Sequence, residues 1–221
     1  TAPPHLKKHQ KLVVMKPEPG TSISVMARKI YTSILASSQS HLTRMERPML
    51  ATEVYRAPLS TLLNQIGLGE MQMRYAKEYV IEMAKWMVFW DTANRVDDTP
   101  APDADFEVAN ASDDEVKESM GVKHMLVSPK LERDDSGVLW LEWQLDAEIN
   151  KMLDPRVFKD GQAHYAYINL VIAAKLSTYA SLALYEICAK FKDNHRGGLT
   201  ASKPTDWWID ALSAKAPAVG E

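Results

Sequence analysis

Residues 60–86, STLLNQIGLGEMQMRYAKEYVIEMAKW, carry the pattern that decides the fold. Three apolar residues follow Ser60 at helical spacing, namely Leu62, Leu63 and Ile66. Ser60 is therefore expected to cap a short helix, which Gly67 and Gly69 end. A second helix is expected almost at once, over residues 70–86. Two helices joined by a tight glycine-containing turn are typical of a helix-turn-helix.

The second helix has one apolar face and one polar face. Its expected inner stripe is Met71, Tyr75, Tyr79, Met83 and Met87. The opposite face carries Gln72, Arg74, Lys77, Glu78, Ile81 and Lys85. Lysine and arginine bring positive charge to phosphates, and glutamine and arginine also read base edges, so this polar face is the candidate DNA-binding surface. A solvated helix face gives the same mixed pattern, and both interpretations stay open at this point.

A β-hairpin is expected after the helix pair. The runs 122–131 and 138–145 are rich in apolar residues and flank the sequence Asp-Asp-Ser-Gly at 134–137, which is typical of a hairpin turn. The second run alternates, with Leu139, Leu141 and Trp143 on one side of the strand. A helix-turn-helix followed by such a hairpin is the order of a winged helix.

The expected wing adds basic residues to the candidate DNA-binding surface. These are Lys123, Lys130 and Arg133, with His124 beside them. A basic wing touches the neighbouring groove or the backbone of DNA. Asp134 and Asp135 at the tip weigh against that role, and a surface hairpin without a nucleic-acid function is the alternative.

Hydrophobic periodicity predicts the remaining elements. They are a strand at 11–15, a long helix at 23–39, strands at 52–57 and 87–90, a short helix at 147–153, an apolar run at 165–173, a buried helix at 178–192 capped by Ser177, and a last helix after Pro204. The expected fold class is α+β: a winged helix-turn-helix with a long N-terminal helix and a β-hairpin wing. Lys7, Lys8 and Lys11 are expected to form a solvated basic tail.

Composition is that of a globular protein, with 46% hydrophobic and 25% charged residues among 221. No apolar run approaches the roughly 20 residues of a membrane-spanning helix. The single cysteine, Cys188, excludes an internal disulfide and suits a reducing cytoplasm. Because Cys188 lies on an apolar helix face, we expect a buried, inert thiol.

Charge is distributed unevenly along the chain. The formal net charge is −3, which by itself argues against nucleic-acid binding. Residues 97–118 contain nine acidic residues against Lys117 alone, a net charge of −8. Subtracting −8 from −3 leaves +5 on the rest of the chain, which permits DNA binding. The acidic segment also contains Pro100 and Pro102 and is expected to form a disordered loop.

The stretch 167–192, YINLVIAAKLSTYASLALYEICAKFK, resembles a segment of iteron-type plasmid replication initiators. In that family an Ile-Asn-Leu strand precedes a helix with the pattern Tyr-Ala-x-x-Leu-Tyr-Glu. The matching residues here are Ile168, Asn169, Leu170, Tyr179, Ala180, Ala183, Leu184, Tyr185, Glu186, Cys188 and Phe191. The opening of the chain and the Trp207–Trp208 segment are similar to the family more diffusely.

The resemblance implies a bacterial cytoplasmic DNA-binding protein with two winged-helix domains. Residues 1–213 would be the first domain, which dimerises and contacts phosphates, and residues 214–221 would begin the linker to a second domain. Monomers of such proteins initiate plasmid replication at iterons, whereas dimers bind the operator and repress their own gene. They recruit host replication proteins. The chain is therefore expected to be a piece cut from a longer protein.

Enzymatic function is not expected. The sequence has no Gly-rich phosphate loop and no catalytic constellation, and its six histidines are scattered, so we expect no catalytic residue, cofactor or metal. The tryptophans are better explained by core packing than by base stacking. Two alternatives to a DNA-binding initiator domain stay open. One is a dimerisation module whose DNA reading is confined to the missing domain, and the other is a winged-helix transcription regulator.

Overall fold

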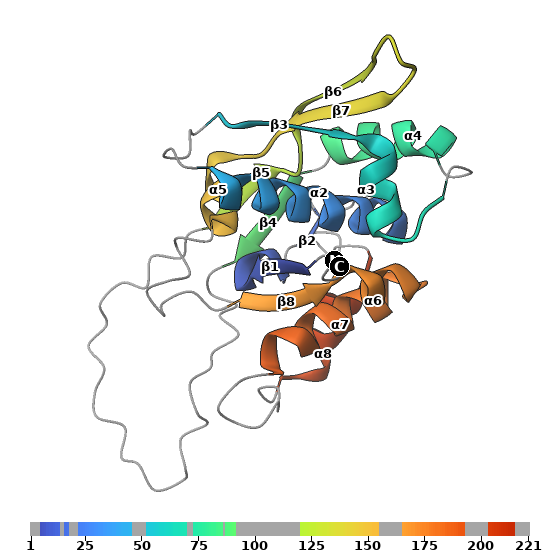
Figure 1. The fold of residues 1–221 in the computed structure, drawn as a ribbon. Coiled ribbons are helices and arrows are strands. Elements are labelled where there is room, and N and C mark those ends of the chain that lie inside the picture. The colour runs from blue at the N-terminus through green and yellow to red at the C-terminus, as the bar shows by residue number, and fades with distance from the viewer. Residues whose placement is uncertain are drawn as a thin grey trace, which may run out of the picture.

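The computed structural model describes residues 5–13, 16–17, 22–45, 52–69, 73–85, 87–91, 120–154, 165–192 and 203–214, drawn as ribbons in Figure 1. Helices and antiparallel strands are mixed along the chain, so the α+β class is confirmed. In chain order the elements are β1 (His5–His9), α1 (Gln10–Val13), β2 (Lys16–Pro17), α2 (Val25–Arg44), β3 (Val54–Pro58), α3 (Leu59–Gln65), α4 (Met73–Lys85), β4 (Met87–Asp91), β5 (Met120–His124), β6 (Val127–Arg133), β7 (Leu139–Gln144), α5 (Ala147–Leu153), β8 (Tyr165–Asn169), α6 (Leu170–Lys175), α7 (Tyr179–Phe191) and α8 (Thr205–Leu212).

The strands pair into three small antiparallel sheets. Their orders are β1–β8, β2–β4–β5 and β3–β7–β6. In the third sheet the chain leaves β3 into α3 and α4, passes through β4 and β5 of the second sheet, and returns as β6 and β7. β7 is the central strand, and its side chains alternate as the sequence predicts, with Leu141 and Trp143 buried.

Helix α2 lies at the centre of the molecule, between the β3–β7–β6 sheet and the β1–β8 pair (Figure 1). The side chain of Ser24 caps it by accepting a hydrogen bond from Ala27 N. It overlaps the helix expected at 23–39 but ends five residues later. Because β1, α1 and β2 precede it, the expected long N-terminal helix does not open the fold.

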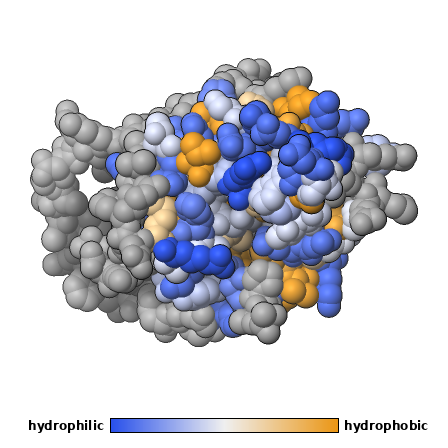
Figure 2. Space-filling view, turned by 45° about the horizontal axis from the view of Figure 1, so that its top comes forward, coloured by the Kyte–Doolittle hydropathy of each residue, from blue (hydrophilic) through white to orange (hydrophobic). Residues whose placement is uncertain are grey.

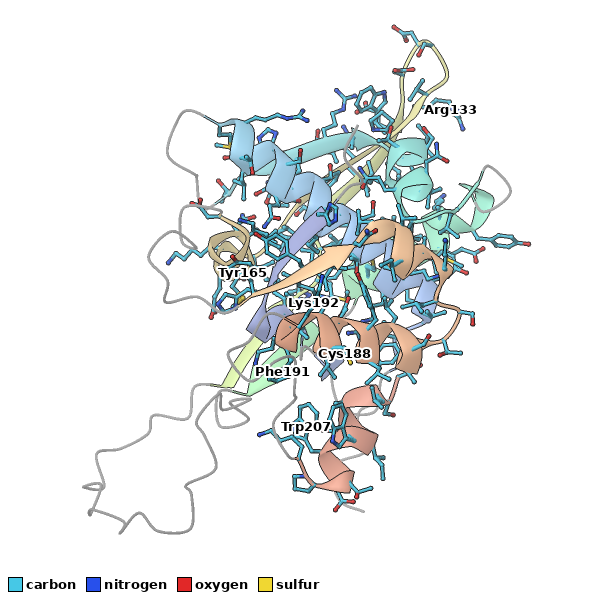
Figure 3. The ribbon with its side chains drawn as sticks, turned by 60° about the horizontal axis from the view of Figure 1, so that its bottom comes forward. Arg133, Tyr165, Cys188, Phe191, Lys192 and Trp207 are labelled. Carbon is cyan, nitrogen blue, oxygen red and sulfur yellow. The ribbon has the colours of Figure 1, made fainter. Side chains whose placement is uncertain are left out.

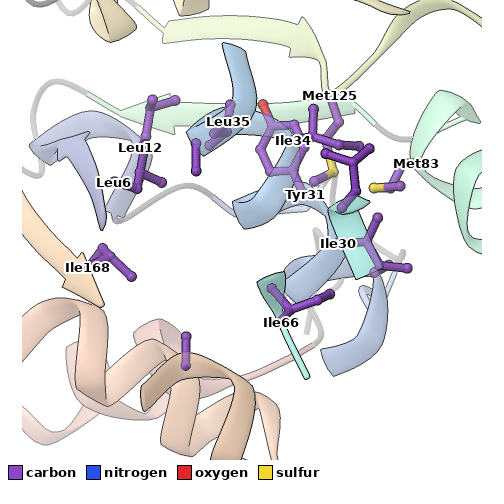
Figure 4. Packing of buried hydrophobic residues seen from close by; sticks show 14 of the residues in the cluster. Leu6, Leu12, Ile30, Tyr31, Ile34, Leu35, Ile66, Met83, Met125 and Ile168 are labelled. Atoms are coloured by element: carbon purple, nitrogen blue, oxygen red, sulfur yellow. The ribbon is translucent and has the colours of Figure 1, made fainter. Parts of the chain in front are cut away.

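Figure 4 shows Ile34 of α2 near Met83 of α4, and Leu35 of α2 near Leu12 of α1, within the core cluster that also contains Ile168 of β8. Each fully buried aliphatic side chain in it contributes about 1.5–3 kcal/mol to folding. The central position of α2 therefore links every layer of the domain.

The helix pair α3–α4 departs from its expected details. Helix α3 begins after Pro58, with no side-chain cap, instead of at Ser60. Gly67, in the turn, has a φ of 69°, a conformation that favours glycine. In α4 the buried residues are Ala76, Val80 and Met83, whereas Tyr75 is 40% exposed. The predicted inner stripe was wrong by one residue at Tyr75, because packing against α2 and β6 fixes the rotation of the helix.

The hairpin has the expected turn but a shorter first strand. Strands β6 and β7 pair around residues 134–137, as predicted, and Gly137 has a φ of 84°. The run expected as one strand at 122–131 is divided at Met125 and Leu126, which are buried. Its first part, β5, pairs with β4 in another sheet.

The N-terminal prediction was wrong. The strand is β1, whose partner is β8, with Leu6 opposite Ile168. Of the residues expected at 11–15, residues 11–13 lie in α1, and 14–15 lie outside the described residues. Lys8 is only 1% exposed, so the expectation of a solvated basic tail fails there.

The C-terminal region contains the expected helices with two corrections. Thr178, not Ser177, caps α7, and it shares a capping box with Ser181. Cys188 is exposed, which overturns the expected buried thiol. The apolar run at 165–173 divides into β8 and α6, with Asn169 capping the helix.

The acidic segment 97–118 lies outside the described residues. Within the described ranges no helix has the length and apolar character to cross a membrane.

Candidate nucleic-acid interface

The polar face of α4 and the β6–β7 hairpin are the candidate interface. Lys77, Glu78 and Ile81 are exposed on α4, so its outer face has the mixed character expected from the sequence. Gln72 lies outside the described residues. Arg74, Lys85 and Lys123 lie in described elements, but the structure does not describe their side chains. Lys130 and Arg133 are exposed on β6.

The hairpin projects beyond the helices, with Arg133 near its tip (Figures 1 and 3). Arg133 donates a hydrogen bond to the carbonyl of Gly137, across the turn. Lys130 forms an exposed ion pair with Glu132, with 3.2 Å between Nζ and Oε2. Exposed pairs of this kind are worth little, so Lys130 can exchange its partner for a phosphate at small cost.

Asp134 organises the hairpin turn through its side-chain oxygens. Its Oδ1 accepts hydrogen bonds from Ser136 N, Ser136 Oγ and Val138 N at 3.0, 2.7 and 2.9 Å. Its Oδ2 accepts one from the indole nitrogen of Trp140 at 2.8 Å. These donors, first those of Ser136 and Trp140, lower the pKa of Asp134 to about 2. Asp134 is therefore ionised at neutral pH, and its negative charge stays at the tip of the hairpin.

Arg56 is a candidate residue that the sequence reasoning missed. It is exposed on β3, between the buried Tyr55 and Ala57. Its guanidinium lies 4.7 Å from the ring centroid of Trp140, the same tryptophan that Asp134 holds. Stacking on an aromatic ring leaves the donor edge of an arginine available for a planar anion. The strict alternation of β3 was the signal that placed this side chain outward.

The surface is charge-balanced rather than strongly basic. Its described cations are Arg56, Lys77, Lys130 and Arg133. Its described anions are Glu78, Glu132, Asp134, Asp135 and Glu142. Figure 2 shows hydrophilic side chains over most of the described surface on this side, with separate apolar patches between them. Because the surface carries both signs of charge, its affinity for a polyanion depends on where each cation lies and on the salt concentration.

The family-like motif in α7 has a structural explanation. Glu186 is fully buried and binds Lys8 Nζ at 2.8 Å and an Arg28 guanidinium nitrogen at 2.5 Å. Arg28 also lies 4.5 Å from the ring centroid of Tyr179. Burial alone would raise the pKa of Glu186, but the charges and hydrogen bonds of Arg28 and Lys8 outweigh it and lower the pKa. These motif residues hold β1, α2 and α7 together.

Other motif residues and tryptophans also serve the core. Tyr185 Oη accepts a hydrogen bond from Asn169 N at 2.9 Å, which ties α7 to β8. Trp143 stacks on Tyr55, with 5.8 Å between centroids, and donates to Ser38 Oγ at 3.0 Å. Core packing is thus confirmed for Trp143, whose ring is 1% exposed.

Comparison with known proteins adds no assignment. No protein-family model matches the chain, and no curated protein matches it significantly.

Proposed function

We propose that this chain is the N-terminal domain of an iteron-type plasmid replication initiator, that it binds double-stranded DNA mainly through phosphates, and that it dimerises. The topology carries the proposal: β3 leads into α3 and α4, and after β4 and β5, which pair in a separate sheet, the chain returns through β6 and β7 to give the order β3–β7–β6. This order supports the winged helix that we propose, in which α4 would be the recognition helix and β6–β7 the wing.

The charged groups support a phosphate-contacting role. Lys77 on α4, Lys130 and Arg133 on the wing, and Arg56 at the sheet are exposed cations on elements that surround one hairpin. Arg74, Lys85, Lys123 and Gln72 extend the same sequence set. Because phosphate contacts are largely independent of base sequence, this surface would position the protein on DNA while a second domain reads the iteron.

The first experiment measures binding of the chain to a labelled duplex over a salt series by fluorescence anisotropy. The logarithm of affinity should fall linearly with the logarithm of salt, by roughly 0.9 per phosphate contact. A chain that binds no duplex even at low salt would refute the DNA-binding part of the proposal.

A second candidate is a dimerisation module without DNA contacts of its own. The observation in its favour is the set of exposed apolar side chains on α6 and α7, which are Val171, Ile172 and Leu184. Sedimentation would then give a stable dimer, and alanine at Lys77 and Arg133 in the intact initiator would leave operator binding unchanged.

A further inference from the structure

We propose that the outer face of the β1–β8 pair is a binding platform for single-stranded nucleic acid. The proposal is independent of duplex binding by α4 and the wing, because α2 lies between the β1–β8 pair and the β3–β7–β6 sheet (Figure 1). It rests on which residues the pairing register brings to one surface.

Alternation divides both strands into a buried and an outer face. Leu6 and Lys8 point into the protein, opposite Ile168 and Ala166, and all four are almost fully buried. The outer face consequently carries His5, Lys7 and His9 from β1 and Tyr165, Tyr167 and Asn169 from β8. Neither strand contains an acidic residue.

The two tyrosines form an aromatic pair on this face. Tyr167 is 45% exposed, and its ring centroid lies 5.1 Å from that of Tyr165, with the rings nearly perpendicular. Figure 3 shows Tyr165 at the edge of the molecule, well away from Arg133 and the wing. The two residues are two positions apart on one strand, or about 7 Å along it. Such a pair offers ring surfaces to unstacked bases.

Lys7 supplies the positive charge beside the rings. Its Nζ lies 5.4 Å from both tyrosine centroids. An exposed cation–π contact is worth only about 0.5–1 kcal/mol, so the ammonium can move to a phosphate as a base takes its place on a ring. Bases on the tyrosines and a phosphate on Lys7 are the two halves of single-strand recognition.

The platform is rigid before any ligand binds. The Gln39 side chain accepts a hydrogen bond from Lys7 N at 2.8 Å and donates one to Lys7 O at 2.9 Å. The next residue, Lys8, is held on the buried side of the strand by its ion pair with Glu186. A prearranged surface loses little conformational freedom on binding.

Charge and shape select this ligand over the alternatives. A duplex hides its base faces inside the stack, so it cannot use the tyrosine rings. A neutral oligosaccharide would use the rings but gain no attraction between opposite charges from Lys7. A single-stranded polyanion with exposed bases uses both features.

The test measures the anisotropy of a labelled oligothymidylate of about 15 nucleotides, a length within the range of single-strand binding sites. Tyr167→Ala should weaken binding by about fivefold or more, and Tyr167→Phe should retain it because the ring remains. Lys7→Gln should reduce the salt dependence by roughly 0.7. Ile209→Ala, at an exposed residue on α8, is the control and should bind like wild type.

Several results would overturn the platform. These are no binding by the wild type, equal affinities of wild type and Tyr167→Ala, an equal loss in Ile209→Ala, an equal loss in Tyr167→Phe, or tighter binding of a neutral oligosaccharide. A labelled duplex in the same assay separates this result from the proposed function, because duplex binding should be unaffected by Tyr167→Ala.

Discussion

Lys8 and Glu186 lie 178 residues apart in the sequence and form an ion pair of 2.8 Å in the interior of the protein. Arg28 binds the other oxygen of the same carboxylate. Two buried cations therefore depend on one buried anion. Replacing Glu186 should consequently destabilise the protein more than replacing Lys8.

Glu186→Gln should destabilise the domain severely. The substitution leaves Lys8 and Arg28 buried without a counter-charge, and breaking such a cluster costs about 3–5 kcal/mol. Urea denaturation followed by circular dichroism measures the change. Glu132→Gln, on the exposed surface of β6, is the control and should change the free energy of unfolding by less than about 0.5 kcal/mol. Similar losses in the two variants would contradict the buried cluster.

Lys8→Met should be far milder than Glu186→Gln. It removes the cation whose pKa burial lowers, and it leaves Arg28 paired with Glu186. We expect a change of less than about 1.5 kcal/mol in the same denaturation experiment, because an apolar side chain of similar length fills the site. A loss as large as that of Glu186→Gln would mean that Lys8 is indispensable to the cluster.

Acidic pH should reduce the contribution of Glu186 to the free energy of unfolding. The folded-state pKa of Glu186 lies below its ordinary value of 4.5, so its stabilisation is fully present above that value and is lost as pH falls through the folded pKa. The difference in unfolding free energy between wild type and Glu186→Gln should consequently shrink below about pH 4.5. Urea titrations from neutral to acidic pH provide the measurement, and a constant difference across that range would refute the assignment.

Gly137 should resist replacement because of its backbone alone. A Cβ there would meet no atom within 4 Å, but the φ of 84° is unfavourable for other residues. Gly137→Ala should therefore cost about 1 kcal/mol, and Gly137→Asn less, because asparagine tolerates this region better. Thermal unfolding compares the two, and equal stabilities of wild type and Gly137→Ala would contradict a turn held at positive φ.

Arg56 tests the part of the interface that the sequence did not reveal. Arg56→Ala should weaken duplex binding and lower its salt dependence by roughly 0.9. Arg56→Lys should restore little, since a lysine lacks the planar group that stacks on Trp140. Anisotropy titrations measure both. Full binding by Arg56→Ala, in a protein whose wild type binds the duplex, would remove Arg56 from the interface.

The sequence correctly predicted those elements that are determined by residues close together in the chain. The turn at 134–137 and helix α5 were predicted correctly because each is determined by neighbouring residues: the Asp-to-Gly turn chemistry, and an apolar run stopped before Pro155. Cap positions were less certain. Ser177 lies next to Thr178, the cap that the structure uses, whereas Ser60 lies two residues after Pro58, the N-cap position of α3. A sequence pattern does not fix the exact first residue of a helix.

Long-range pairing explains the remaining differences. Strand β1 has the sequence His-Leu-Lys-Lys-His, which resembles a solvated tail until β8 supplies its partner strand and Glu186 its counter-charge. Lysine is rarely fully buried unless paired, and the pairing residue here is remote in sequence. The rotation of α4, which exposes Tyr75 and buries Ala76, likewise depends on α2 and β6 rather than on the helix itself.

The salt dependence of duplex binding in two triple variants tests the central claim most directly. The first carries alanine at Lys77, Lys130 and Arg133, and the control carries alanine at Lys151, Lys175 and Lys192, which are exposed on other elements. Both lose three positive charges. The proposed interface predicts that only the first variant loses salt dependence, by roughly 0.9 for each lost phosphate contact. Equal slopes for the two variants would contradict it.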